Sequence, residues 1–334
     1  MTPGCSEVLF HCAGTARTGL GHVARSANLA EAALRSGIIP FFYCEGELGR
    51  EYLAARGFSL LASDLEVPPH VILDHPSHLR PVPPSLVGDL RKRGAVHIGI
   101  LDERGEARRL VDALVDVWLP PSLVAALPAC ANAYYGFSRA IVHKSFAAWR
   151  VARKATSSAP RILVSMGGTE PKGLTCKALM ILREVGFSGP LTVVLPLDFQ
   201  DFSMLGNLLK DFSPAVVLQD VRNMAEKMAD CDLVFTKLGQ TQLEAFCMGC
   251  IPILLEPSTK HLELSIQTAE CFGAGWPVFE LGLSDAPLAN GVQALAAGLG
   301  DSSALENMMV TASRLVDGFG TERALAALCG TDGG

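Results

Sequence analysis

The sequence predicts an α/β protein made of two doubly wound domains in tandem. Short apolar runs alternate with helical patterns along the 334-residue chain, which is typical of parallel sheets with crossover helices. A glycine-rich turn between a strand and a helix opens each half, at residues 14–25 and 166–171. A chain of this length also favours two hydrophobic cores over one.

In the first half, apolar runs predict six strands and the intervening patterns predict four helices. Two of the runs end in a carboxylate, Asp74 and Asp102, at the sheet edge where ligands bind in open α/β folds. We expect strands at residues 8–12, 38–44, 58–61, 71–74, 95–102 and 115–119, and helices at 21–34, 47–56, 84–93 and 107–114.

The pattern restarts after a polar, proline-ended segment, residues 152–160, which is the expected linker. We expect strands at 161–165, 191–195, 215–218, 232–236, 251–255 and 278–281, and helices at 172–185, 202–212, 223–229, 240–248, 288–299, 304–316 and 321–328. The predicted domains are residues 1–152 and 160–305. The C-terminal helices, 306–334, are expected to pack back on the first domain, and a ligand cleft is expected between the two domains.

Composition excludes several classes of function. Hydrophobic residues make up 49% of the chain and charged ones 19%, with a net charge of −6, so a packed globular protein that does not bind nucleic acid is expected. No apolar run reaches the roughly 18–20 residues of a membrane span, and the N-terminus lacks the pattern of a signal peptide. We therefore expect a cytoplasmic protein without stable membrane insertion; the oligomeric state is open.

The cysteines and histidines offer two metal motifs, both of which we interpret structurally. The ten cysteines lie mostly inside apolar runs, as reduced, buried cysteines do. Cys247-Met-Gly-Cys250 has no second ligand pair and favours core packing. Asp74-His75-Pro-Ser-His78 could suggest a metal site, but its proline indicates a loop after a strand. We expect neither a metal nor a cofactor.

The turn at residues 14–25 aims backbone N–H groups and a helix N-terminus at an anion. His22 lies at the start of that helix, and a helix N-terminus disfavours the imidazolium, which leaves a neutral ring able to accept a proton. The alternative is a tight turn with a half-exposed histidine. In the second half, Gly167 and Gly168 follow a strand and can admit a diphosphate, or they only make a turn.

The stretch Lys237-Leu-Gly-Gln-Thr-Gln-Leu-Glu244 also joins a strand to a helix, with Gly239 at the turn. One interpretation is a capping box, in which Thr241 and Glu244 satisfy backbone N–H groups. The other gives Glu244 to a ribose diol, while Lys237 and the loop amides face phosphate.

The order of these motifs resembles a known family. The motifs are Gly19-Leu-Gly-His-Val-Ala-Arg25, Ile72-Leu-Asp-His75, Ile100-Leu-Asp-Glu103, residues 135–146, 162–171 and 223–232, and Leu238-Gly-Gln-Thr-Gln-Leu-Glu244. Over roughly residues 8–280 the chain is similar to the nucleotide-sugar hydrolases of pseudaminic acid biosynthesis and the related spore-coat polysaccharide proteins. It more distantly resembles the glucosaminyl transferase that acts on the lipid-linked peptidoglycan precursor.

The resemblance implies a GT-B fold and hydrolysis of a UDP-linked amino or deoxy sugar at the anomeric carbon, without a metal. It implies His22 as general base, Gly167 and Gly168 at the diphosphate, Met224 near the base and Glu244 at the ribose. We add Lys237, Gly239, Gln240 and Thr241 to the nucleotide site. Residues expected on the sugar side are Gly21, Arg25, Asp74, Lys260 and His261.

The sequence departs from the family pattern at three places. Leu238-Gly-Gln-Thr241 replaces two glycines and Ser-Thr, Thr259-Lys-His-Leu262 replaces an Asn-Gln pair that handles the sugar, and residues 14–18 lack the usual acid. These changes affect sugar identity more than nucleotide binding. Two alternatives to hydrolysis therefore stay open: glycosyl transfer from a UDP-sugar, and a catalytically silent nucleotide-sugar binder.

Overall fold

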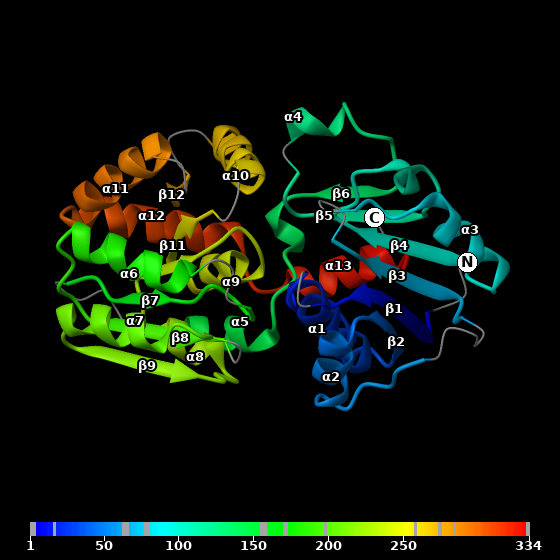
Figure 1. The fold of residues 1–334 in the computed structure, drawn as a ribbon. Helices are drawn as coiled ribbons and strands as arrows, with labels where there is room; N and C mark the ends of the chain where they lie inside the picture. The colour runs from blue at the N-terminus through cyan, green and yellow to red at the C-terminus, as the bar shows by residue number, and fades with distance from the viewer. Residues whose placement is uncertain are drawn as a thin grey trace. The chain divides into compact units, whose positions relative to one another are not determined.

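The computed structural model describes residues 5–15, 18–61, 67–76, 80–119, 121–153, 159–169, 173–196, 199–256, 259–272, 276–282 and 285–331. The side chains of residues 121–122, 259–261, 264, 271–272 and 285–287 lie outside this description. The chain divides into two compact units. Unit 1 contains residues 1–143 and 318–334, and unit 2 contains residues 144–317. Each unit is built on its own sheet (Figure 1).

Unit 1 contains a six-stranded parallel sheet in the order β2-β1-β3-β4-β5-β6. This is the doubly wound order that places a topological switch point between β1 and β3. Its strands are β1 (Glu7–Ala13), β2 (Ile39–Glu45), β3 (His70–Asp74), β4 (His97–Leu101), β5 (Ala113–Asp116) and β6 (Ala133–Tyr135). Its helices are α1 (Gly21–Arg35), α2 (Glu47–Ala54), α3 (Pro84–Lys92), η1 (Glu106–Arg109), α4 (Pro121–Val124), η2 (Phe137–Arg139) and α13 (Gly320–Leu328).

Residue alternation along the strands of unit 1 separates two faces. Helix α1 and the C-terminal helix α13 contact each other and cover one face of the sheet (Figure 1). On the other face, Leu9, Leu73 and Ile100 pack with Val87 and Leu90 of α3. Phe10, Cys12 and Asp74 therefore face α1, whereas His11 shares the α3 face.

Unit 2 contains a second six-stranded parallel sheet, ordered β12-β11-β10-β7-β8-β9. This is the Rossmann order, with its switch point between the first and fourth strands of the unit, β7 and β10. The strands are β7 (Ile162–Val164), β8 (Leu191–Leu195), β9 (Ala215–Gln219), β10 (Leu233–Thr236), β11 (Ile251–Leu255) and β12 (Phe279–Leu281). The helices are α5 (Lys144–Val151), α6 (Leu174–Glu184), α7 (Phe202–Leu208), η3 (Leu209–Asp211), α8 (Met224–Ala229), α9 (Gln240–Met248), α10 (Thr259–Phe272), α11 (Asp285–Leu299) and α12 (Ser302–Leu315).

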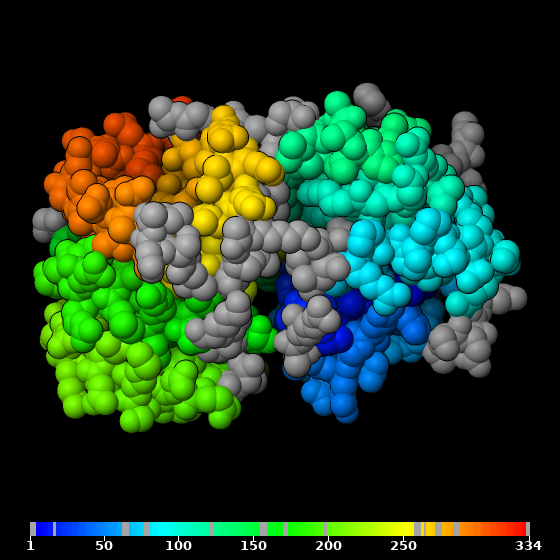
Figure 2. Space-filling view, turned by 45° about the horizontal axis from the view of Figure 1, so that its top comes forward, coloured from blue at the N-terminus to red at the C-terminus, as the bar shows by residue number. Residues whose placement is uncertain are grey.

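One apolar core of unit 2 forms where α6, α7 and α11 pack on the sheet, around buried residues such as Phe235, Leu182 and Leu295. Helix α9 begins directly after β10 and packs against α5, α8 and α12. Helices α10 and α11 reach the surface of this unit, in yellow and orange (Figure 2). Strands β7 and β10 are parallel neighbours, so the loops that follow them lie at the same edge of the sheet.

The structure corrects several expected elements. Residues 107–114 are not a helix: η1 ends at Arg109, and β5 begins at Ala113 because it pairs with β4. Sheet pairing overrides the helix propensity of this alanine- and leucine-containing segment. The last strand of the unit is β6, a half-buried three-residue strand without an apolar run to reveal it. Residues 58–61 make only an isolated bridge, Leu60 to Phe42.

Among the described residues, three α-helices lie where none was expected, and one of them is the four-residue α4. Helix α5 occupies residues 144–151, and α10 occupies residues 259–272, including the segment interpreted as a sugar loop.

The unit boundary differs from the expected domain division. It falls at His143 and Lys144, before the predicted linker, and α12 belongs to unit 2 rather than to a C-terminal extension. Of the C-terminal helices, only α13 is part of unit 1. There the Thr321 hydroxyl accepts a hydrogen bond from the Val142 N–H at 3.0 Å and donates one to the Val142 carbonyl. Among the described residues, every helix is too short or too polar to span a bilayer.

Candidate functional site

A buried carboxylate lies at the switch point of unit 1. Asp74 ends β3, is fully buried, and faces the first turn of α1. Its Oδ1 accepts a hydrogen bond from His22 Nδ1 at 2.7 Å, and its Oδ2 accepts one from Ser26 Oγ at 3.1 Å. His22, Arg25 and Ser26 are three and four residues apart on one helix face, so β3 and α1 together assemble this cluster.

Arg25 joins two carboxylates in the same cluster. Its Nε donates to Asp74 Oδ2 at 3.0 Å, and its Nη1 pairs with Asp102. Burial by itself would raise the pKa of Asp74, but the charges of Arg25 and His22 hold that pKa well below its usual range. Burial would lower the pKa of Arg25, yet Asp74 and Asp102 raise it. Asp74 and Arg25 are therefore a buried ion pair at neutral pH.

Asp102, directly after β4, has a left-handed backbone with φ of 49°. This conformation is uncommon for a residue other than glycine. Three contacts hold it: the Asp102 N–H donates to the Val115 carbonyl at 3.0 Å, the Val117 N–H donates to Oδ1 at 3.2 Å, and Arg25 pairs with Oδ2. Asp102, held in this conformation, thus fixes the Nη1 end of the Arg25 guanidinium.

The Asp74 contact defines the chemistry of His22. A carboxylate only accepts hydrogen bonds, so His22 Nδ1 carries the proton and Nε2 carries the lone pair. A carboxylate on Nδ1 also stabilises the imidazolium that forms when Nε2 takes a proton. Besides the helix N-terminus expected from the sequence, the ring therefore contacts a buried carboxylate. Gly21 is the first residue of α1, and a Cβ there would meet nothing within 4 Å.

Two loops meet at the switch point of unit 2. Gly167 follows β7 with a φ of 90°, and a Cβ at that position would lie 3.1 Å from Lys237 Nζ. Lys237 follows β10, and its ammonium donates to the Met166 carbonyl. A lysine therefore ties together the ends of two adjacent parallel strands. Gly168 is the next residue of the first loop and is exposed.

The start of α9 does not contain a capping box, which corrects one of the two interpretations. Gly239 is the N-cap, with a φ of 145°, and no side chain caps the helix. Gln240 and Thr241 begin the helix, and Gln240 Nε2 donates to Glu244 Oε1 at 3.5 Å. Glu244 is therefore a carboxyl group near the start of α9 whose hydrogen-bond partner is a neutral amide.

Two carboxyl groups near this loop have raised pKa values. Burial raises the pKa of Glu244 to about 8, and the hydrogen bond from Gln240 only partly offsets that effect. Burial also raises the pKa of Glu256, after β11, to about 8, although the Leu238 N–H donates to its Oε1 at 3.2 Å. Gln242 is fully buried, and both its amide atoms lack a hydrogen-bond partner among the described residues.

The remaining expected residues are dispersed. Met224 begins α8 and is half-buried, beside its N-cap Asn223. Lys260 and His261 fall in the first turn of α10, but their side chains lie outside the described residues. The structure thus brings His22, Arg25 and Asp74 together in unit 1, and Gly167 and Lys237 together in unit 2.

Sequence reasoning missed several residues of these clusters. Ser26 could have been found from its spacing of four residues from His22 on the helix. Asp102 was noted at a strand end but not assigned to the site, and Glu256, which also stands directly after a strand, was not noted. No local pattern indicates His11 and Glu45, which approach His75 only because three strands are adjacent.

Comparisons with known proteins establish the fold. No family model matches the sequence. An uncharacterized protein of Methanocaldococcus jannaschii is 36% identical over 108 residues, which is 31% of this chain and 22% of that protein. The matched segment therefore spans less than a quarter of that relative.

Solved structures match nearly the whole chain at low identity. MurG of Acinetobacter baumannii has a TM-score of 0.66 at 13% identity, covering 96% of this chain and 98% of that one. The spinosyn rhamnosyltransferase SpnG, solved with thymidine diphosphate, has a TM-score of 0.57 at 15% identity, covering 93% and 96%. A UDP-N-acetylglucosamine 2-epimerase has a TM-score of 0.55 at 12% identity, covering 95% and 93%. With its two parallel six-stranded sheets, the chain has the α/β fold of the GT-B glycosyltransferases.

Proposed function

We propose that the protein is a nucleotide-sugar enzyme that transfers a glycosyl group to a hydroxyl acceptor, with His22 as its general base. The observation that carries the proposal is the 2.7 Å contact between His22 Nδ1 and the buried Asp74, at the switch point of unit 1. The acceptor oxygen would attack the anomeric carbon as the bond to the diphosphate breaks. The acceptor proton would go to His22 Nε2, and the nucleoside diphosphate would leave.

We assign the nucleotide to the switch point of unit 2. The support is the pair of glycine turns with positive φ, the Lys237 ammonium beside Gly167, and the Glu244 carboxyl, whose hydrogen-bond partner is the neutral Gln240 amide. Backbone N–H groups and a lysine suit a diphosphate, and a carboxylate accepts two hydrogen bonds from a ribose diol. The neighbour SpnG was solved in complex with thymidine diphosphate, which supports the ligand class.

Hydrolysis is the second candidate, with water in place of the acceptor. The order of the sequence motifs favours hydrolysis. The structural neighbours include a rhamnosyltransferase, which favours transfer. The same base serves both reactions, so the two candidates differ in what occupies the acceptor position.

One assay separates these candidates. The purified chain would be incubated with UDP-N-acetylglucosamine or a dTDP-sugar, with and without alkyl and aryl glycoside acceptors, and release of nucleoside diphosphate would be measured. Transfer predicts release that depends on an acceptor, and hydrolysis predicts equal release with water alone. Binding without turnover under every condition would contradict an enzymatic role and leave the silent binder. His143→Asn, at a histidine paired with Glu31 outside the cluster, is the control for His22→Asn.

A further inference from the structure

Three side chains from different strands converge on the α3 face of the sheet in unit 1. His11 lies within β1, Glu45 ends β2 and His75 follows β3 directly. The parallel register aligns His11 with Leu73 and Ala13 with Glu45. Residues 11, 13, 45, 73 and 75 therefore point to the same side of the sheet. Asp74 points to the opposite side, toward His22 and Arg25.

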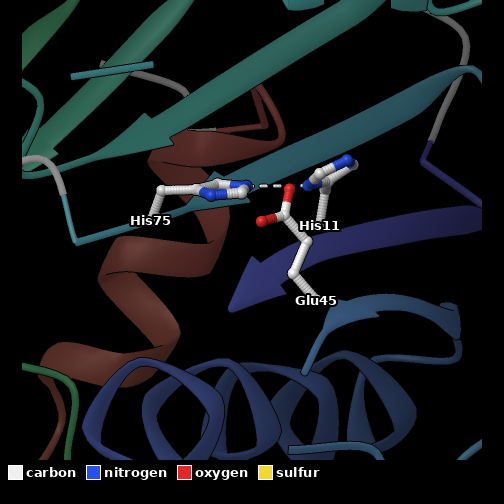
Figure 3. A group of neighbouring side chains, drawn as sticks. All are labelled: His11, Glu45 and His75. Carbon is white, nitrogen blue, oxygen red and sulfur yellow. Dashed lines mark hydrogen bonds between the residues drawn. The ribbon is translucent and has the colours of Figure 1, made fainter. Parts of the chain in front are cut away.

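The functional atoms of these residues lie close together. His11 Nδ1 and His75 Nε2 are 2.7 Å apart, and one ligand atom from each of the three residues lies within 4.8 Å of the other two (Figure 3). The His11 ring also packs against Tyr43, with the ring centroids 4.6 Å apart and the planes tilted by 36°. Among the described residues, no ion pair engages the Glu45 carboxylate.

We propose that His11, Glu45 and His75 form a binding site for a divalent transition-metal ion, with Zn²⁺ as the best-matched ion. Two imidazoles and a carboxylate are a known three-residue ligand set of zinc, which leaves a fourth position for water. Tetrahedral bonds of 2.0–2.1 Å would put the two ring nitrogens roughly 3.3 Å apart. The rings would need to separate by only about 0.6 Å to admit the ion.

Burial and charge around the three residues fit a metal ligand set. His11 is 7% exposed within an otherwise apolar strand. Burial and the neighbouring His75 lower the pKa of His11 to about 3, so its ring is neutral and available as a ligand. Burial likewise lowers the pKa of His75. Glu45 is exposed, which gives an ion a path from solvent and supplies a compensating negative charge.

The alternative is a simple hydrogen bond between the two imidazoles. Such a bond needs a proton on one of the two facing nitrogens, and Glu45 would play no part in it. The two explanations therefore differ in the role of Glu45 and in whether the protein binds a metal at all.

The test uses the full chain, stripped with dipicolinic acid and titrated with Zn²⁺ against a chromophoric chelator. We expect one Zn²⁺ per chain and a rise in melting temperature on the order of 5 °C at a hundredfold excess over Kd. His11→Asn and His75→Asn should each weaken binding on the order of a hundredfold, and Glu45→Gln about tenfold. His143→Asn, which breaks another His–carboxylate contact in unit 1, should leave binding unchanged.

Cobalt substitution identifies the ligands. Co²⁺ in the wild-type protein should give visible d–d bands without a thiolate charge-transfer band, since the proposed ligands are nitrogen and oxygen. Absence of stoichiometric binding, equal binding in His11→Asn and His143→Asn, or a thiolate band would overturn the proposal.

Because Glu45 is exposed, Glu45→Gln keeps the test valid if a histidine variant unfolds. Circular dichroism of each metal-free variant checks this point. All these readouts are independent of nucleotide-sugar turnover.

Discussion

His22 is the residue on which catalysis depends in our proposal. His22→Asn keeps a side chain that can donate to Asp74 but removes the basic nitrogen. We expect turnover to fall by about 10²–10⁴, the usual contribution of a general base. Nucleotide affinity should barely change, because the nucleotide is assigned to unit 2. Steady-state kinetics and isothermal titration calorimetry measure both quantities. Near-full turnover in the variant would exclude His22 as the base.

Asp74→Asn tests the buried carboxylate itself. Removing its charge leaves the buried Arg25 with Asp102 alone, which should cost about 3 kcal/mol of stability, the low end for breaking a buried pair. Urea unfolding measures this loss. Because the pKa of Asp74 is lowered in the folded state, its stabilisation is complete above the ordinary carboxyl pKa near 4 and is lost below it. The difference between wild type and variant should therefore shrink as the pH falls below about 4.

The pKa of Glu244 is shifted in the opposite direction from that of Asp74, and this shift leads to a prediction for nucleotide binding. Its pKa of about 8 means that the carboxyl is mostly neutral at pH 6.5 and ionised above pH 8. A ribose diol donates to the ionised form, so affinity for UDP-N-acetylglucosamine should rise on the order of tenfold from pH 6.5 to 8.5. Glu244→Gln should show a flat pH profile. An equal rise in wild type and variant, measured by calorimetry, would remove Glu244 from the nucleotide site.

At the scale of elements, the strand-to-helix turns place the chemistry, and the turn before α9 shows how. Gly239 has a φ of 145° and open space around its Cβ position. The cost of Gly239→Ala is therefore the backbone conformation alone, on the order of 1–3 kcal/mol. The turn should shift to relieve that strain, so we expect weaker nucleotide binding together with lower stability.

Gly206→Ala is the matched control for this prediction. Gly206 lies inside α7, has open space at its Cβ and is not among the residues with positive φ. The same substitution there should be neutral or stabilise by up to about 1 kcal/mol, because alanine is the better helix former. Equal effects of the two substitutions, measured by thermal unfolding and nucleotide titration, would show that the Gly239 turn has no special role.

At the scale of the whole molecule, the C-terminal helix completes the first unit. Helix α13 contacts α1, β4 and β5 and buries Ala324, Leu325 and Leu328. A chain that ends at Asp317 would expose the apolar surface that this helix covers. We expect faster amide hydrogen exchange throughout β4 and β5, with exchange in β7 and β8 unchanged. Unaltered protection of β4 and β5 would show that unit 1 folds without its last segment.

The two-unit α/β fold, most of the strands and both glycine turns could be predicted from the sequence. These features come from local patterns: apolar runs, helical periodicity and glycine at strand ends. The errors fell where local patterns are weak or contested. Strand β6 has only three half-buried residues, and residues 107–114 pair with β4 despite their helical composition.

Which side chains meet depends on how the chain folds, and local patterns do not show it. Asp74 and His75 are consecutive, yet strand alternation directs Asp74 to His22 and Arg25, and His75 to His11. Sequence could place His22 at a helix start but not identify the carboxylate that fixes its tautomer. The raised pKa of Glu244 could not be predicted from the sequence either, because it arises from burial in the folded unit. Strand order, register and burial are long-range properties of the folded chain, and the chemistry of both clusters follows from them.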